Sequence, residues 1–324
     1  MRILFGGEVK GNSGPSNVNR SIRANFTESF TGIDSRNKYR KTLEGLGKCL
    51  RCDVVVLSGV TRFGCILLGI AKIFRKKTVF IMHGCGEYEV ELNHIQGMEK
   101  GLRQEQFLLQ NADLLLPVSR KFMIWFQERY PQYADKTKYL FNGIDTELLQ
   151  SLTVGQKKAG TAAAAGGSQI LKNNQIVAQA VEELGGSVRL NIYGPWQTAA
   201  PAFQHSCSRG HIPHGDFIAQ LKETELFILN SLFETFSIAV IEALLCGCSV
   251  LVSEVAGVTD LLALEENDMI HDPMDVEEIK RKILYLQENP NNERILSQLD
   301  LNEWSYRKSV QRLEQLCAEL VKTA

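Results

Sequence analysis

The sequence predicts an α/β protein with two Rossmann-like, doubly wound parallel-sheet domains. The chain has 324 residues, enough for two domains of ordinary size, and short apolar runs alternate with helical patterns in both halves. Continuous apolar runs are typical of parallel strands that helices cover on both faces. A polar, glycine-containing stretch at residues 153–161 separates the halves. We therefore expect one domain at residues 1–147 and a second at residues 148–302.

The expected elements alternate along each half. In the first half we expect strands at residues 3–5, 54–57, 79–82, 114–117 and 138–141, and helices around residues 17–26, 63–74, 93–110 and 120–130. In the second half we expect strands at residues 162–165, 189–193, 226–229, 250–253 and 269–271, and helices at residues 173–184, 238–246 and 275–287. Ligands bind beyond the carboxyl ends of the strands in such sheets, so the segments that follow the strands are the candidate sites.

Charge is unevenly distributed, although the net charge is only −1. Residues 1–145 carry 22 Lys and Arg against 14 Asp and Glu, whereas residues 146–324 carry 14 against 23. A basic domain face suits an anionic membrane surface or an acceptor that carries a diphosphate, and a solvated helix face is the alternative. No nucleic-acid partner is expected. The basic positions cluster at Arg36, Lys38, Arg40 and Lys41, and again at Lys72, Arg75, Lys76 and Lys77.

The sequence shows neither a membrane span nor a secretion signal. Its longest nearly apolar run, residues 238–252, is interrupted by Glu242 and is too short to cross a bilayer. The N-terminus leads directly into an expected strand. The eight cysteines lack the paired spacing of a zinc site, so we expect free buried thiols. A cytoplasmic protein is expected, with the inner face of the membrane as a place where the basic domain can bind.

Two glutamates eight residues apart are the most informative feature of the chain. Glu234 ends a segment that follows an expected strand, and Glu242 lies in the helix that begins after Ser237, its possible N-cap. A helix N-terminus presents unpaired N–H groups to an anion such as a phosphate. Carboxylates on both sides of that position suit a ligand with hydroxyl groups on both sides of a diphosphate. The pattern therefore indicates a nucleotide sugar.

The stretch from Glu234 to Glu242 resembles the E-x7-E region of the retaining glycosyltransferases of family 4, the group 1 transferases. Pieces elsewhere in the chain agree in their order with that family: residues 11–17, 82–84, 139–145, 191–194 and 211–214. The resemblance implies the GT-B fold, in which two Rossmann-like domains face each other across a cleft. It also implies that the last helix, residues 303–324, packs back on the first domain. Ser237 stands where the family typically has glycine.

The resemblance also implies roles for individual residues. Three catalytic residues are expected: Lys172 to neutralise the leaving diphosphate, Glu234 to contact hydroxyls of the transferred sugar, and His83 to contact the donor sugar or the acceptor. Glu242 is expected to bind the ribose hydroxyls. The family's arginine before the lysine is missing from residues 167–169. Glu87, Glu89 and Glu91 are equal candidates to assist the acceptor hydroxyl. The other expected substrate-binding residues are Gly11, Gly14, Asn142, Gly194, Thr235, Phe236 and Ser237.

These observations predict a retaining, metal-independent transferase with no cofactor. Its donor would be a UDP- or GDP-linked sugar and its acceptor a saccharide hydroxyl, which by analogy is lipid-linked and belongs to bacterial surface polysaccharide assembly. Two alternatives stay open: a non-catalytic nucleotide-sugar-binding partner of another transferase, which the missing arginine favours, and a sugar-nucleotide epimerase on the same scaffold. The loop at residues 11–15 lacks G-x-G-x-x-G, which argues against a dinucleotide oxidoreductase.

Overall fold

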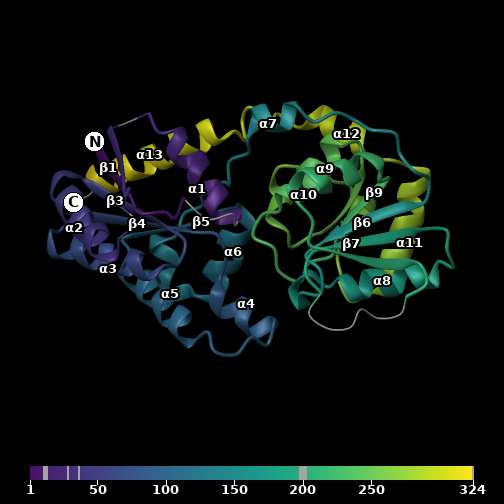
Figure 1. Ribbon diagram of the computed structural model, residues 1–324, viewed down its shortest axis with the longest axis horizontal. Coiled ribbons are helices and arrows are strands. Elements are labelled where there is room, and N and C mark those ends of the chain that lie inside the picture. Colours follow the sequence, from purple (N-terminus) through teal and green to yellow (C-terminus); the bar gives the residue numbers. More distant parts are fainter. Residues whose placement is uncertain (10–13, 28, 36, 197–202, 323–324) are drawn as a thin grey trace. The chain divides into compact units, whose positions relative to one another are not determined.

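The computed structural model divides the chain into two compact units. It describes all residues except 10–13, 28, 36, 197–202 and 323–324. Unit 1 comprises Met1–Asp145 and Leu301–Ala324, and unit 2 comprises Thr146–Asp300. Each unit contains one parallel sheet with helices on both of its faces (Figure 1). No helix in the described part of the chain is long and apolar enough to cross a bilayer.

Unit 1 is a three-layer α/β domain. Its five-stranded sheet has the order β2-β1-β3-β4-β5, and all of its strand pairs are parallel. Helices α2, α3 and α5 cover one face, and α1 packs against α13 on the other (Figure 1). The strands are β1 Arg2–Phe5, β2 Ser29–Gly32, β3 Val54–Ser58, β4 Lys77–Met82 and β5 Leu114–Pro117. The helices are α1 Gly14–Ala24, α2 Lys38–Arg51, α3 Arg62–Ile73, α4 Gly86–Leu92, α5 Glu99–Asn111, α6 Arg120–Arg129 and α13 Tyr306–Lys322, with the 3-10 helix η1 Pro131–Lys136.

Unit 2 repeats the same architecture with six parallel strands in the order β11-β10-β9-β6-β7-β8. α8 packs on α11 over one face, where a cluster of fully buried apolar side chains forms the core, and α9 and α12 pack on α10 (Figure 1). The strands are β6 Thr161–Ala165, β7 Arg189–Tyr193, β8 Ser206–Gly210, β9 Leu226–Leu229, β10 Ser249–Ser253 and β11 Met269–Ile270. The helices are α7 Thr146–Gln150, α8 Asn174–Glu183, α9 His214–Glu223, α10 Ile238–Leu245, α11 Val276–Glu288 and α12 Asn292–Gln298, with the 3-10 helices η2 Ile170–Lys172, η3 Gly257–Asp260 and η4 Glu266–Asp268.

Short polar side chains begin several of the helices. Asn37 accepts hydrogen bonds from the second and third N–H groups of α2, and Thr61 accepts one from Gly64 in α3 at 2.9 Å. Ser119 does the same for α6, and Asp275 does so for α11. These residues satisfy N–H groups that have no partner inside the helix, so the local sequence defines where each helix starts.

The structure corrects several of the expected elements. Residues 138–141 are not a strand, although Lys138 and Leu140 donate backbone hydrogen bonds to Leu115 and Pro117 of β5. The helix expected over residues 93–110 begins only at Glu99. Left-handed backbone at residues 94 and 97 interrupts the preceding turn, and a separate helix, α4, ends at Leu92. Strands β2 and β8 were not expected. Both lie at sheet edges, where their polar sequences are tolerated.

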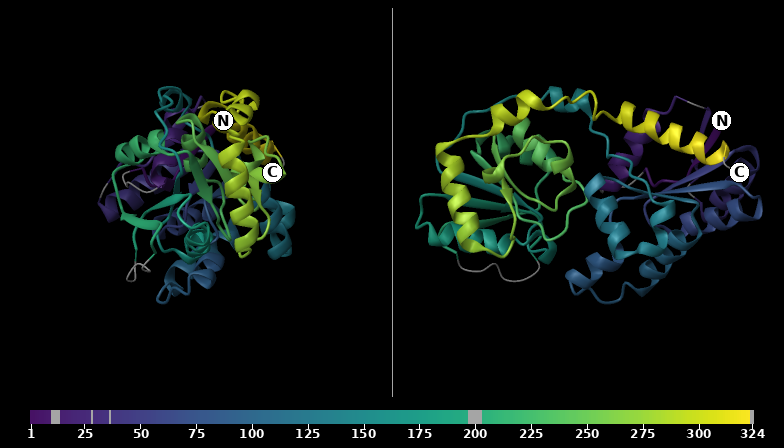
Figure 2. Two further views of the ribbon diagram at one scale, coloured as in Figure 1. Left: turned by 90° about the vertical axis from the view of Figure 1, so that its right-hand side faces the viewer. Right: turned by 180° about the vertical axis from the view of Figure 1, so that it is seen from behind.

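The last helix, α13, belongs to unit 1. It lies beside α1 and contacts β4, as the views of Figures 1 and 2 agree. Trp304 packs edge-on against Phe141 with ring centroids 5.1 Å apart, and its carbonyl accepts the Ile144 N–H at 2.9 Å. Glu314 accepts the backbone N–H of Thr27 at 2.8 Å. The C-terminal segment therefore completes the unit that the N-terminal residues begin.

All eight cysteines are free, and six of them are buried. Cys207 is exposed and Cys65 is partly exposed, so the expectation of buried thiols is wrong for these two positions. Cys207 lies on the edge strand β8, where alternate side chains face solvent.

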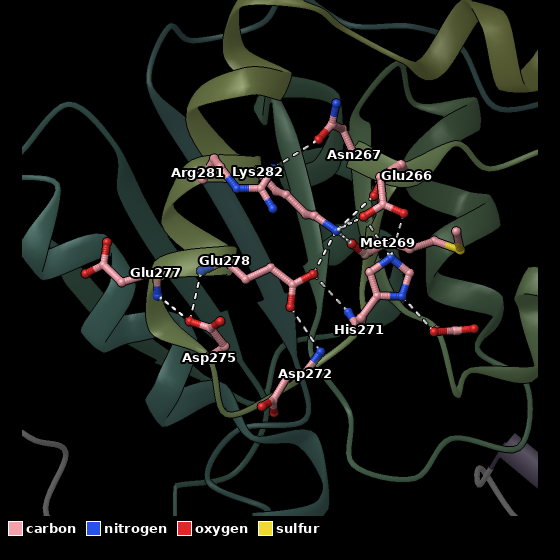
Figure 3. A network of polar contacts seen from close by, with 11 residues as sticks. Glu266, Asn267, Met269, His271, Asp272, Asp275, Glu277, Glu278, Arg281 and Lys282 are labelled. Atoms are coloured by element: carbon pink, nitrogen blue, oxygen red, sulfur yellow. Dashed lines mark hydrogen bonds and ion pairs between the residues drawn. The ribbon is translucent and has the colours of Figure 1, made fainter.

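A polar network joins η4, β11 and α11 in unit 2 (Figure 3). The ammonium of Lys282 is completely buried and donates to the carbonyls of Glu266 (2.9 Å) and Met269 (2.6 Å) and to the Glu278 carboxylate (2.7 Å). The Glu266 carboxylate lies farther away, at 3.3 Å. The three closer acceptors can take the three N–H groups, which offsets the cost of burying the charge. His271 joins the same network between two carboxylates, with Nδ1 2.7 Å from Glu254 and Nε2 3.0 Å from Glu266.

Candidate functional site

The loop from Asn230 to Ser237 connects β9 to α10 and carries the first of the two signature glutamates. Glu242 lies in α10 and Glu234 in the loop, as the sequence pattern indicated. The next loop supports this one, because the Gly257 N–H donates to the Glu234 carbonyl and the Val258 N–H donates to the Phe236 carbonyl, both at 3.0 Å. The backbone of the loop is therefore held between the carboxyl ends of β9 and β10.

Ser237 occupies the N-cap position of α10 but does not cap it with its side chain. Its backbone has φ +89° and ψ +89°, a left-handed conformation that glycine adopts more easily. The expectation of a serine cap is therefore wrong: the position is right, but its side chain makes no capping hydrogen bond. Without a side-chain cap, the first N–H groups of α10 remain suited to an anion.

Lys172 lies beside Glu234, although 62 residues separate them in sequence. Its ammonium forms an ion pair with Oε2 of Glu234, and the Phe236 N–H donates to Oε1 at 3.4 Å. Both side chains are largely buried. The Leu232 N–H also donates to the Leu171 carbonyl at 2.8 Å, which ties η2 to the loop. The cation, the carboxylate and the helix N-terminus thus form one cluster.

Glycines allow the ends of β6 and β7 to approach each other next to this cluster. Gly166, Gly167 and Gly194 all have positive φ, and the N–H groups of Gly166 and Gly167 both donate to the Tyr193 carbonyl. A side chain on Gly194 would lie 2.6 Å from the Gly167 backbone nitrogen, and one on Gly166 would clash with the Lys172 side chain. Gly194 therefore has a packing role that requires glycine, whatever ligand it contacts.

Glu242 is buried in α10, and its carboxylate has a partner that was assigned no role from the sequence. His214, the first residue of α9, places Nε2 2.8 Å from Oε1 of Glu242. The histidine is exposed, whereas the carboxylate is not. The sequence motif at residues 211–214 resembles the family without indicating this contact. Only the packing of α9 on α10 brings the two side chains together.

His83 follows β4 in unit 1 and belongs to a chain of three hydrogen-bonded side chains. The Asn19 amide donates to the Glu8 carbonyl at 2.9 Å, so its oxygen accepts from the Ser58 hydroxyl at 2.5 Å. The Ser58 hydroxyl has a single hydrogen, which it donates to Asn19. Its contact with Nε2 of His83 at 2.7 Å is therefore one in which the hydroxyl oxygen accepts and Nε2–H donates. Burial lowers the pKa of His83 to about 4, which keeps the imidazole neutral at pH 7. Nδ1 is then its unprotonated nitrogen.

A pocket of about 500 Å³ opens at this edge of the unit 1 sheet. His83, Ser58 and Asn19 line it together with Glu89 and the apolar side chains of Val60, Met82, Val90, Met98 and Leu102. Its volume is that of a small-molecule site. Further polar side chains also line it, those of Glu8, Ser16, Thr61, Gln104 and Glu105. Asn19 and Ser58 were not recognised from the sequence, because a buried Asn or Ser gives no local signal.

The structure distinguishes the three glutamates that the sequence left equivalent. All three lie in helix α4. Glu87 accepts the Tyr130 hydroxyl at 3.0 Å, and Glu91 pairs with Arg129 at 2.7 Å. Glu89 alone of the three lines the pocket beside His83, and it accepts the Cys85 N–H at 3.2 Å. Glu89 is therefore the best placed of the three to meet a ligand in this pocket.

Two further expected residues lie in unit 1. Gly14 is the first residue of α1, and the N–H of Asn142 donates to the Val118 carbonyl at 2.9 Å just beyond β5. Gly11 lies outside the described residues. Gly14 follows β1, the Asn142–Val118 hydrogen bond follows β5, and His83 follows β4, so all three lie at the carboxyl ends of strands. Within the described residues, no group of three or more His, Cys, Asp or Glu side chains is arranged to hold a metal ion.

Comparison with known proteins agrees with this geometry. Residues 204–299 match the model of the family described as glycosyl transferases group 1. The match covers 96 of the 324 residues. The segment includes His214, Glu234 and Glu242, whereas Lys172 and unit 1 lie outside it. A search of curated protein sequences finds no significant match.

Solved structures share the whole fold. HepE from Anabaena in complex with UDP-glucose aligns with a TM-score of 0.66 at 16% identity over 100% of both chains. Sucrose-phosphate synthase from Thermosynechococcus elongatus aligns with a TM-score of 0.68 at 13% identity, covering 100% of this chain and 99% of the other. TarM from S. aureus gives 0.64 at 12% identity, covering 84% and 58%. The two parallel-sheet units therefore match GT-B glycosyltransferases, and together with the matched segment they support a glycosyltransferase.

Proposed function

We propose that this protein is a retaining glycosyltransferase that moves a sugar from a nucleoside diphosphate donor to a hydroxyl of a saccharide acceptor. One observation carries the proposal: Lys172 and Glu234 are paired beside the N-terminus of α10, and the same helix holds the buried carboxylate of Glu242. A cation and a helix N-terminus suit a diphosphate, while the carboxylates suit the hydroxyl groups of the two sugars that flank it.

Each group in unit 2 then has a distinct task. The first N–H groups of α10 and the Lys172 ammonium bind the diphosphate and stabilise the charge that develops on it as it leaves. Glu242, held by His214, accepts hydrogen bonds from the ribose hydroxyls. Glu234 contacts Lys172 and the Phe236 N–H, which are donors a diphosphate needs. When the donor binds, the diphosphate therefore takes over Lys172 and the Phe236 N–H, and the Glu234 carboxylate instead accepts hydrogen bonds from the hydroxyls of the transferred sugar.

The proposed reaction needs no metal ion and no cofactor. The bond between the anomeric carbon and the phosphate oxygen breaks, and the acceptor oxygen bonds to the same face of that carbon. The proton of the acceptor hydroxyl passes to the leaving phosphate oxygen. The protein contributes positioning and charge stabilisation. The missing arginine near Ser168 leaves this task to Lys172 and the backbone N–H groups.

Unit 1 contributes the pocket that contains His83. A neutral imidazole with an unprotonated Nδ1 can accept a hydrogen bond from a sugar hydroxyl, and Glu89 offers a second acceptor in the same pocket. We assign this pocket to the acceptor or to the transferred sugar. By analogy, the acceptor is lipid-linked and the reaction belongs to bacterial surface polysaccharide assembly, with the protein in the cytoplasm at the inner face of the membrane.

The donor is proposed to be UDP- or GDP-linked. The fold shared with HepE, which was solved with UDP-glucose, supports UDP as the first nucleotide to test. The test is thermal unfolding with UDP, GDP or ADP in the presence of a chelator, on the native protein and on Glu242→Ala. A ligand at a hundred times its dissociation constant adds about 2.7 kcal/mol of stability. Stabilisation by one nucleotide that is lost in the variant supports the proposal, and stabilisation by none contradicts it.

A turnover assay then separates the alternatives. Incubation with the matching nucleotide sugar, with and without a mixture of saccharide acceptors, is followed by nucleotide release and by mass spectrometry of the sugar. Product that depends on the acceptor supports a transferase, and a converted donor without acceptor indicates an epimerase. Binding without any product over many acceptors indicates a non-catalytic partner, which the missing arginine favours.

A further inference from the structure

The outer side of α2 carries an exposed apolar row. Residues 39, 43, 46 and 50 are spaced by four, three and four positions, so at 3.6 residues per turn they share one side of the helix. The opposite side packs inward, with Gly45 and Cys49 buried. Four large apolar side chains in a row on the surface are more than scattered exposure explains. The apolar row and its exposed fractions are Tyr39 75%, Leu43 67%, Leu46 37% and Leu50 52%.

Positive charge surrounds the apolar row. Helices α2 and α3, which pack side by side, contain seven Lys and Arg residues and a single acidic residue, Glu44. Three of the seven are paired with carboxylates: Lys41 with Glu8, Lys48 with Glu44, and Lys72 with Asp113. Glu44 is turned to other partners: it pairs with Lys48 at 2.5 Å and accepts the N–H groups of residues 34 and 35. Arg40, Arg51 and Arg62 are exposed and form no ion pair with another described residue. The face thus presents unbalanced positive charge.

We propose that this face of unit 1 binds a bilayer that contains anionic lipid, with the apolar row of α2 inserted among the headgroups. A helix with an apolar side and flanking Lys and Arg lies in the membrane interface in this way. This proposal rests on the membrane location given under the proposed function, and it adds the surface that makes the contact. The alternative partner for the apolar row is a second copy of this chain. Pairing of two copies through this face would bring like charges together. The apolar row also has only four side chains, whereas each partner in a stable protein interface contributes about 20–30 residues.

The charge and the apolar row make separate contributions. Burial of an exposed leucine in the interface corresponds to roughly tenfold in affinity or more. Each arginine near an anionic surface contributes roughly fivefold, and only this part is screened by salt. Binding should therefore require anionic lipid, weaken with salt and depend on the leucines at every salt concentration.

Vesicle flotation of the full-length protein tests the proposal. Vesicles of phosphatidylcholine alone are compared with vesicles that also contain phosphatidylglycerol, using the native protein, Leu43→Ser/Leu50→Ser, Arg40→Gln/Arg51→Gln, and Leu284→Ser as a matched control. Leu284 is an exposed leucine on α11 of unit 2. We expect binding to the anionic vesicles only, roughly a hundredfold loss in the leucine variant, a loss of about 25-fold in the arginine variant, and no change in the control.

Three results would overturn the proposal: equal binding to both kinds of vesicle, native-like binding by the leucine variant, or no vesicle binding together with a dimer that the leucine variant abolishes in light scattering. The substituted side chains are exposed, and an unchanged melting temperature verifies that each variant is folded. Stabilisation by UDP is measured on the same proteins. Because this face lies in unit 1 and the donor-site cluster lies in unit 2, loss of vesicle binding with retained UDP stabilisation separates failure of this surface from failure of the proposed function.

Discussion

Replacement of Lys172 by methionine tests the central cluster of unit 2. The substitution keeps most of the length and volume of the side chain but removes the charge that faces Glu234. Among the described residues, the Glu234 carboxylate then keeps only the long hydrogen bond from the Phe236 N–H at 3.4 Å. Its side chain is 13% exposed and that of Lys172 is 21% exposed, so the remaining charge is poorly solvated.

The magnitude follows from these exposures. Breaking a fully buried ion pair costs about 3–5 kcal/mol, and an exposed pair contributes about 0–1 kcal/mol. The Lys172–Glu234 pair is buried but not completely, so we expect Lys172→Met to lower the free energy of unfolding by about 2–3 kcal/mol. For a domain of this size that corresponds to a decrease in melting temperature of roughly 4–12 °C.

Scanning calorimetry at pH 7 provides the measurement, and Lys158→Met provides the matched control. Lys158 pairs with Glu223 in the same unit, but these side chains are 64% and 47% exposed. The control should lose at most about 1 kcal/mol. The double variant Lys172→Met/Glu234→Gln removes both charges and should recover part of the loss. If Lys172→Met is no less stable than Lys158→Met, or if the double variant is less stable still, the pair does not neutralise a buried charge and the reasoning is refuted.

Three further predictions concern single positions. Ser237→Gly should raise the free energy of unfolding by about 1 kcal/mol, because glycine adopts φ +89° without strain; thermal unfolding measures this, and a decrease would contradict it. Ser58→Ala should lower kcat about tenfold with little change in donor affinity, since His83 loses the acceptor that orients it; equal effects on kcat and donor binding would argue against a positioning role. The hydrogen bond to Glu254 raises the pKa of His271, so its stabilising contribution is complete below the unfolded pKa of about 6.5 and is lost as pH rises through the folded pKa. The melting temperature of the native protein should therefore fall towards that of His271→Gln as the pH rises above about 6.5, and parallel curves would exclude the linkage.

Local patterns were sufficient for much of the fold. Strands β3, β4, β9 and β10 are built around continuous apolar runs, with Ser, Lys or Thr only at strand ends; none is an edge strand, and they are almost entirely buried. The edge strands β2 and β8 were missed because each pairs with one neighbour only and tolerates polar residues. The start of α5 was also missed, because left-handed backbone at His94 is not evident from its sequence.

The sequence by itself determined the order of the elements and the positions of Glu234 and Glu242 around the start of α10, because burial patterns and helix boundaries are local properties. Only the tertiary structure decided which side chains meet. Lys172 reaches Glu234, and His214 reaches Glu242, because parallel strands place loops distant in sequence at one sheet edge. The hydrogen bond from Ser58 to Asn19 has the same origin. Such contacts depend on the register and packing of separate elements, which short-range sequence patterns do not record.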